Sequence, residues 1–175
     1  LRILFGLTMR RSFPYSRRAF MQNLAFVAAV VPATMALLVL IGAETAYMEI
    51  IMILEGITFV IMGISPLLTS HEVGDGVLVL RQGWYFRAEV PMGDIRSVAR
   101  IERGPVRTGV FFRLLDATLY VTSRRSDLIE VRLRSKRTFG WALGKRADRV
   151  VFDAEDAAAM VQTIKDDGSF APVDA

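Results

Sequence analysis

Two long apolar segments, separated by two residues, dominate the first part of the chain. Leu24 to Ala43 contains 20 residues without a charged side chain, and Ala46 to Leu68 contains 23 residues with only Glu49 and Glu55 as charges. A helix rises about 1.5 Å per residue, so each segment can cross the roughly 30 Å hydrocarbon core of a bilayer. The pattern predicts two transmembrane helices.

The predicted helices, at about residues 20–43 and 46–68, must form an antiparallel hairpin (residues 19–68) because only Glu44 and Thr45 separate them. A hairpin buried in a soluble protein is disfavoured, since the other residues are too few to cover it. The basic N-terminal segment, residues 1–18, sets the orientation by the positive-inside rule. We therefore expect a multi-pass protein of the cell membrane with both termini in the cytoplasm; the basic residues next to the first helix are Arg10, Arg11, Arg17 and Arg18.

The second predicted helix carries a polar stripe. A charge at the position of Glu55, near the middle of the bilayer, costs a few kcal/mol unless it is protonated or finds a partner. Thr58 lies on the same side of the helix, and Gly56 and Gly63 could allow another backbone to approach closely. The stripe can be a proton or ion site, or a contact within the hairpin or an oligomer. We favour the contact.

From Val77 onward the apolar period is two residues, which is typical of half-buried strands. Gln82 and Gly83 separate the first two strands, Val77–Arg81 and Trp84–Val90, and predict a two-residue hairpin turn. In the second strand, alternate residues from Trp84 to Val90 point to one apolar face. Further strands are predicted at 95–102, 117–122, 128–134 and 149–152, and segments 111–115 and 138–143 can add two more. Residues 69–76 are expected to be a linker.

The period becomes helical again near the C-terminus. Asp153 is predicted as the N-cap of an amphipathic helix that Gly168 ends, with a tail at 168–175 that is expected to be flexible. The apolar face of this helix consists of Ala157, Met160, Val161 and Ile164. Strands followed by one terminal helix, residues 77–167, favour a small barrel or strongly bent sheet plugged by the helix.

Four segments carry fold-level motifs: Gly76–Arg81, Gly83–Arg87, Pro91–Ile95 and Arg149–Asp153. Together they resemble the bacterial and archaeal pleckstrin-homology (PH)-like domains that follow transmembrane helices in small membrane proteins. The resemblance covers residues 73–167 and implies a seven-stranded bent barrel with a C-terminal capping helix, used for binding or scaffolding. The fold class expected is thus an α+β membrane protein. The basic pocket that eukaryotic relatives use for phosphoinositides does not carry over, because the first hairpin has too short a loop.

Side chains for catalysis are scarce. The chain has one histidine and no cysteine, which argues against a zinc site or a Cys/His dyad, and His71 is expected to be a solvated linker residue. Segment 140–146 has the glycines of a phosphate loop one residue too close, with Arg146 in place of Ser or Thr. We predict neither an enzyme nor a cofactor or metal site.

Charge placement is the strongest remaining signal. Residues 96–149 carry 14 Lys or Arg against 5 Asp or Glu. The linker spans roughly 28 Å at most, and anionic headgroups attract nearby basic residues by about 1 kcal/mol each. Besides the four N-terminal arginines, the headgroup candidates are the basic residues near predicted turns, namely Arg124, Arg125, Lys136, Arg137, Lys145 and Arg146. A generic solvated basic face is the alternative. Nucleic acid is not expected, because exposed aromatic residues are not interleaved with the basic ones.

These patterns favour a non-enzymatic, membrane-anchored scaffold or adaptor. Its PH-like domain would dock on anionic lipid of the inner leaflet or on a protein partner. The alternative is an accessory subunit of a larger membrane complex, in which the transmembrane hairpin binds another protein or a second copy of the chain.

Overall fold

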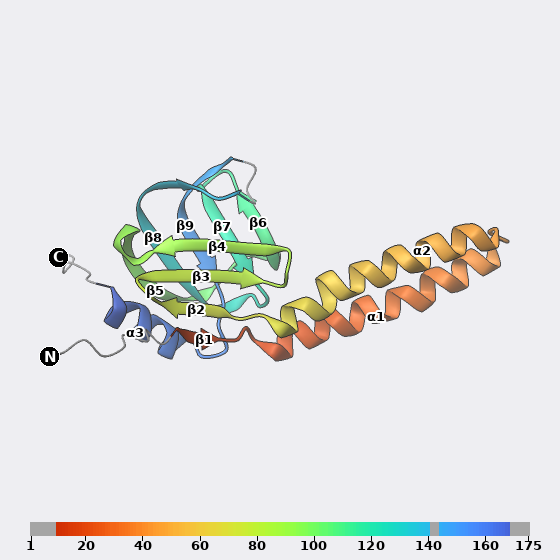
Figure 1. The fold of residues 1–175 in the computed structure, drawn as a ribbon, viewed down its shortest axis with the longest axis horizontal. Helices are drawn as coiled ribbons and strands as arrows, with labels where there is room; N and C mark the ends of the chain where they lie inside the picture. The colour runs from red at the N-terminus through yellow and green to blue at the C-terminus, as the bar shows by residue number, and fades with distance from the viewer. Residues whose placement is uncertain (1–9, 141–143, 169–175) are drawn as a thin grey trace, which may run out of the picture.

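A helical hairpin projects from one end of a β domain (Figure 1). The computed structural model describes residues 10–140 and 144–168, without the side chains of residues 17–20, 22, 23, 26 and 27. Most of the predicted N-terminal segment and of the predicted tail therefore lies outside the described residues. The architecture is α+β, with helices first, then two sheets and a C-terminal helix.

The hairpin consists of α1 (Arg17–Leu40) and α2 (Thr45–Thr58), which continues as the π-helical turn η1 (Phe59–Ile64) and the 3₁₀ turn η2 (Ser65–Leu68). The continuous helix Thr45–Leu68 is 24 residues long, about 36 Å, and by length and composition it can cross a membrane. Among the described side chains of α1, the apolar stretch is the shorter Ala28–Leu40.

The surface of the hairpin is apolar. No residue of α2 is buried, and Ile50, Ile53, Leu54 and Ile57 each expose more than half of their surface. A helix that is apolar on all sides and uncovered by protein is typical of a membrane span.

The hairpin joins the β domain through two paired strands. Strand β1 (Arg11–Phe13) leads into α1, and β2 (His71–Gly74) follows η2; the two pair antiparallel, with Phe13 opposite His71. The prediction of a linker at 69–76 is therefore wrong, because half of that segment belongs to a sheet. Because the strand that enters the hairpin pairs with the strand that leaves it, the domain is held more tightly to the hairpin than an extended linker would hold it.

The strands form two sheets that cross each other (Figure 1). The first has the order β1-β2-β3-β4 and the second the order β5-β8-β9-β7-β6, with β7 and β9 parallel. Their remaining strands are β3 (Val77–Gln82), β4 (Phe86–Pro91), β5 (Ile95–Arg103), β6 (Gly109–Arg113), β7 (Thr118–Thr122), β8 (Ser126–Thr138) and β9 (Arg146–Phe152).

The expected barrel is not closed. Within the part of the chain that the structure describes, no ladder joins β4 to β5 or β1 to β6, because the short turn η3 (Met92–Asp94) carries the chain from one sheet to the other. The two sheets instead share one apolar core, in which Leu80, Phe86 and Phe152 are almost completely buried.

Two predicted turns differ from the structure. The β3–β4 turn contains three residues, Gly83 to Tyr85, because Gln82 pairs with Phe86; Trp84 therefore leaves the predicted inner face and is 64% exposed. The predicted turn at Arg124 and Arg125 is not the tip of a hairpin, because β9 lies between β7 and β8 and the turn therefore connects two strands that are not neighbours.

The C-terminal helix α3 (Ala157–Asp167) packs against β5, β8 and β2. Met160 and Ile164 are completely buried, as the predicted apolar face requires. Its N-cap is Asp156, whose Oδ1 accepts the N–H of Ala159 at 2.9 Å. The predicted cap, Asp153, is buried further upstream.

Candidate functional site

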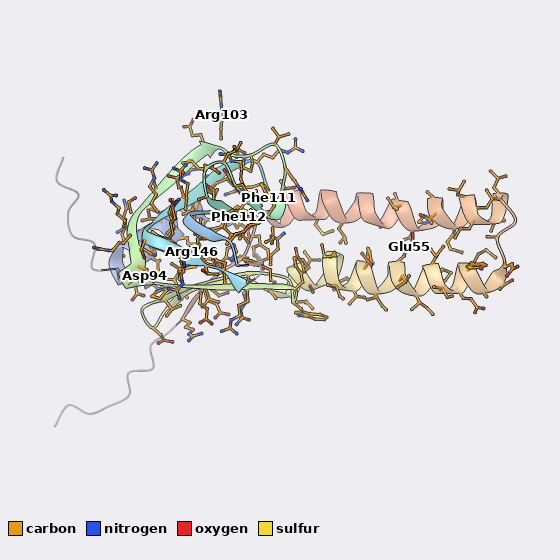
Figure 2. All side chains as sticks on the ribbon, turned by 90° about the horizontal axis from the view of Figure 1, so that it is seen from above. Glu55, Asp94, Arg103, Phe111, Phe112 and Arg146 are labelled. Carbon is orange, nitrogen blue, oxygen red and sulfur yellow. The ribbon has the colours of Figure 1, made fainter. Side chains whose placement is uncertain are left out.

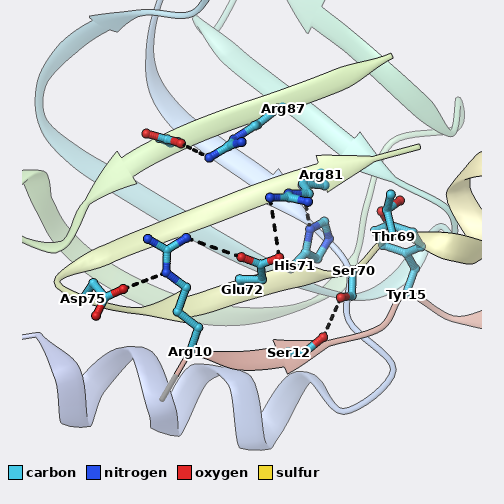
Figure 3. Close-up of polar contacts among 11 residues, drawn as sticks. Arg10, Ser12, Tyr15, Thr69, Ser70, His71, Glu72, Asp75, Arg81 and Arg87 are labelled. Atoms are coloured by element: carbon cyan, nitrogen blue, oxygen red, sulfur yellow. Dashed lines mark hydrogen bonds and ion pairs between the residues drawn. The ribbon is translucent and has the colours of Figure 1, made fainter. Parts of the chain in front are cut away.

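The end of the β domain that meets the helices, here called the proximal end, is held by hydroxyl groups at the base of the hairpin. The Trp84 N–H donates to Ser65 Oγ at 3.0 Å, and the Gly83 N–H donates to Thr69 Oγ1 at 2.9 Å. The Tyr15 hydroxyl lies 2.6 Å from the same Thr69 oxygen (Figure 3). These bonds attach the β3–β4 turn to both ends of the hairpin.

Gly83 is required for this contact. Its φ is +61°, and a Cβ at this position would lie 2.4 Å from Ser65 Oγ. The turn therefore approaches η2 as closely as a glycine backbone allows.

His71 is completely buried beneath this contact, so the prediction of a solvated linker residue is wrong. Its ring meets Tyr15 and Phe152 edge-on, with centroids 4.8 Å and 5.4 Å apart. Nδ1 accepts the Arg81 N–H at 3.2 Å (Figure 3). Burial lowers the pKa of His71 to about 3, only partly offset by the backbone of Asp153. The imidazole is therefore a neutral core group, and the aromatic contacts and the hydrogen bond with Arg81 give it a structural role.

Asp153 links the second sheet to the proximal end of the domain. Its carboxylate accepts the Ser123 N–H at 2.5 Å and the Ser123 hydroxyl at 2.6 Å. Burial raises the pKa of Asp153, and hydrogen bonds from Ser123 and from the backbone of Ser16, the residue before α1, oppose that rise. The β7–β8 turn thus belongs to the proximal end.

The opposite, distal end of the domain lies about 20 Å away, since β3 and β4 each run six residues at about 3.3 Å per residue. It contains the turn at Asp75 and, after β4, η3. Figure 2 shows Asp94 at the end away from the hairpin and Phe111 toward it.

The predicted headgroup candidates do not form one patch. Arg124 and Arg125 lie at the proximal end, but Arg124 donates to Asp127 Oδ2 and to the Ala154 carbonyl, both at 2.7 Å. Arg125 is exposed. Arg17 and Arg18 begin α1 at the same end, and their side chains lie outside the described ones.

The other candidates lie elsewhere. At the distal end, Arg10 bonds Asp75 at 2.7 Å and Arg137 pairs with Asp94. Arg11 is the first residue of the edge strand β1, and its guanidinium donates to Thr163 Oγ1 on α3 at 3.4 Å. Lys145 and Arg146 are exposed at the start of β9. Arg146 lies opposite Thr138, the residue after Arg137. The last candidate is Lys136.

Lys136 belongs to a groove in the second sheet, near the distal end, which we call the basic groove. Its volume is about 580 Å³. Five basic side chains line it together with one acid, and sequence reasoning identified only Lys136 among them. The lining residues are Arg96, Ser97, Arg132, Leu133, Arg134, Ser135, Lys136, Asp148 and Arg149.

The helix-assembly candidates divide between two sides of the hairpin. Gly63 is buried, and a Cβ there would lie 2.9 Å from Leu24 Cδ1, so it permits close packing of η1 on α1. Gly56 faces open space, and the exposed Thr58 hydroxyl donates to the Leu54 carbonyl at 2.8 Å. Glu55 is half-buried, and its Oε2 has no hydrogen-bond partner among the described residues; Figure 2 places it along the hairpin, between the two helices.

Within the described ranges, no group of three or more His, Cys, Asp or Glu residues is placed to hold a metal ion. Comparison of the chain with protein-family models, with curated proteins and with solved structures found no match.

Proposed function

We propose that this protein is a non-enzymatic, membrane-anchored adaptor, whose hairpin crosses the bilayer twice and whose β domain is held on the cytoplasmic side to bind an anionic partner. One observation carries the proposal: an apolar, uncovered hairpin is inserted between two paired strands, β1 and β2. This arrangement fixes the domain next to the membrane.

The orientation rests on charge. Arg17 and Arg18 begin α1, whereas the α1–α2 turn carries only Glu44, and the positive-inside rule then places the β domain in the cytoplasm. Trp84, exposed beside η2, stands where interfacial tryptophans anchor membrane proteins. The pair of sheets with a C-terminal helix is consistent with a PH-like module, although its barrel is open.

Fewer basic residues can dock on lipid headgroups than the sequence predicted. Electrostatic attraction fades over about 8 Å at physiological salt, and the distal end lies about 20 Å from the hairpin. Of the predicted headgroup candidates, Arg17, Arg18 and the exposed Arg125 lie at the proximal end and are near enough to the bilayer, whereas Arg124 at the same end is held by Asp127. The remaining basic surface is free for a partner in the cytoplasm.

Washing membranes that contain the full chain with alkaline carbonate tests the anchor. The proposal expects the protein to stay in the membrane pellet, because about 36 Å of apolar helix leaves lipid only with detergent. Release of the protein into the wash would reject it.

A second candidate function, an accessory subunit of a membrane complex, is favoured by Glu55, whose hidden Oε2 lacks a partner. A carboxyl group in this position can bond to a polar group of another helix. Replacing Glu55 by Leu should then abolish copurification of a membrane partner in mild detergent, while the control Glu49→Leu, at an exposed position nearer the helix end, should not. Equal recovery with both variants would contradict this function.

A further inference from the structure

The basic groove lies where both ladders of β8 are irregular. On one side, Ile95 pairs with Leu133 and Ser97 with Arg132, so Arg96 is an extra residue on β5. Such a β-bulge turns the extra side chain away from its regular direction. The bulge thus accounts for an arginine of β5 in the groove lining.

On the other side, β8 separates from β9. Arg132 pairs with Arg149 and Arg137 with Ala147, so four residues of β8, Leu133 to Lys136, stand opposite Asp148 alone. Within the described residues, Arg134, Ser135 and Lys136 have no partner in either ladder. Because β9 pairs with β8 again at Arg137, whereas the β5 ladder ends at Leu133, the backbone groups of these residues are available for pairing with another extended chain on the side of β5.

The charge of the groove is only partly neutralised inside the protein. Glu130 lies 2.7 Å from Arg132 and 3.7 Å from Arg149, and the Arg134 side chain donates to the Ile95 carbonyl at 3.3 Å. Arg96 and Lys136 have no ion pair with any described acid and are exposed. A ligand for this groove must be negatively charged.

We infer that the basic groove binds an acidic segment of a partner protein in extended conformation, as an added strand beside Arg134–Lys136. The length of the unpaired stretch, about 10 Å at 3.3 Å per residue, suits a segment of roughly three to five residues and exceeds the size of a single phosphate. Carboxylates on alternate residues of such a strand would face the basic side chains of the groove. This inference deepens the proposed function and depends on it for the location of the groove in the cytoplasm.

The groove is too far from the hairpin for the lipid of its own membrane. It adjoins the Arg137–Asp94 ion pair of the distal end, about 20 Å from the base of the hairpin. A bilayer headgroup is therefore the weaker candidate, and a cytoplasmic protein the stronger one.

The test uses the full chain in neutral nanodiscs and a fluorescent peptide of alternating glutamate and serine, with binding followed by anisotropy at low salt. We expect binding, and we expect Arg96→Gln/Lys136→Gln to weaken it about fivefold or more, from the loss of two charge contacts. These two side chains have no ion pair, so the variant should keep the circular dichroism spectrum of the parent.

The control variant Arg103→Gln/Arg146→Gln removes the same charge from two exposed residues, labelled in Figure 2, that do not line the groove. It should change the affinity less than about twofold. Equal weakening by both variants, or no binding by the parent, would overturn the inference. Two peptides with alternate amides methylated, one in each of the two possible registers, keep the charge, but one of them has the amides of its pairing edge blocked; unchanged affinity for both would overturn the added strand.

Competition separates the sources of the negative charge. The labelled peptide should be displaced by its unlabelled form, and not by the same concentration of inorganic phosphate or of phosphate groups on vesicles that contain phosphatidylglycerol. Equal displacement by phosphate would make the groove a small-anion site, and equal displacement by vesicles a lipid site; either result rejects the protein segment. The peptide assay does not depend on membrane topology, so absence of peptide binding would reject the groove and not the membrane anchor. Release of the protein by carbonate would reject the membrane anchor and not the groove.

Discussion

At the scale of single residues, the most informative side chains are buried where the hairpin meets the sheets. His71 is held between Tyr15 and Phe152 and accepts one backbone hydrogen bond. Asp153 holds the β7–β8 turn next to the residue that precedes α1. Their polar atoms connect β2, β3, the turn after β7 and the start of the hairpin, so these residues set how the domain sits relative to the hairpin.

His71 predicts a dependence of stability on pH. Its pKa is about 3 when folded and about 6.5 when unfolded, so between these values the unfolded chain binds the additional proton. The contribution of His71 to stability is complete above pH 6.5 and falls by about 1.4 kcal/mol per pH unit below it.

The variant His71→Leu isolates this effect. It loses the acceptor for the Arg81 N–H, so it should be less stable by about 1–3 kcal/mol at pH 7. As the pH falls from 6.5 toward 4, the difference from the parent should narrow, because the variant has no imidazole to protonate. Denaturant unfolding in micelles, followed by near-ultraviolet circular dichroism, measures the difference; a constant gap across this range would disprove the assignment.

At the scale of elements, the strands with clear alternation were predictable. The patterns at Val77–Arg81, 95–102 and 128–134 correspond to β3, β5 and β8, and the apolar face of α3 was also identified. Strands β1 and β2 were missed because each is short and their pairing joins residues far apart along the chain, such as Phe13 and His71. No local pattern contains that information.

The basic groove was only partly predictable for the same reason. The alternation of Arg132, Arg134 and Lys136 along one strand is visible in the sequence. The bulge that adds Arg96, and the separation of β8 from β9, depend on the registers of two ladders. Registers result from the packing of the whole sheet.

The β3–β4 turn provides a prediction at this scale. Gly83 and Gly76 both have positive φ, +61° and +69°, but only Gly83 is close to the hairpin; a Cβ at Gly76 would meet nothing within 4 Å. Alanine at either site costs about 1–2 kcal/mol of backbone strain. Gly83→Ala should cost about 1–3 kcal/mol more, because it displaces Ser65 from the Trp84 N–H.

Unfolding of both glycine variants in micelles measures this difference, with Gly76→Ala as the matched control for backbone strain. Equal stabilities would mean that the turn does not depend on its contact with the base of the hairpin.

At the scale of the whole molecule, the connection between hairpin and sheet determines which surfaces can meet which partners. The hairpin leaves the first sheet through β1 and returns through β2, so in the proposed topology the proximal end faces the bilayer and the distal end faces away from it. That topology restricts lipid contacts to the proximal end and leaves the basic groove open to the cytoplasm.

The central claim is that the hairpin crosses the bilayer and keeps the β domain inside. The chain contains no cysteine, so single substitutions provide clean reporters: Glu44→Cys between the two helices and Lys165→Cys on the exposed side of α3. Labelling with a membrane-impermeant maleimide compares intact and permeabilised cells. The account predicts that position 44 is labelled in intact cells and position 165 only after permeabilisation; labelling of position 165 in intact cells, or of position 44 only after permeabilisation, would contradict it.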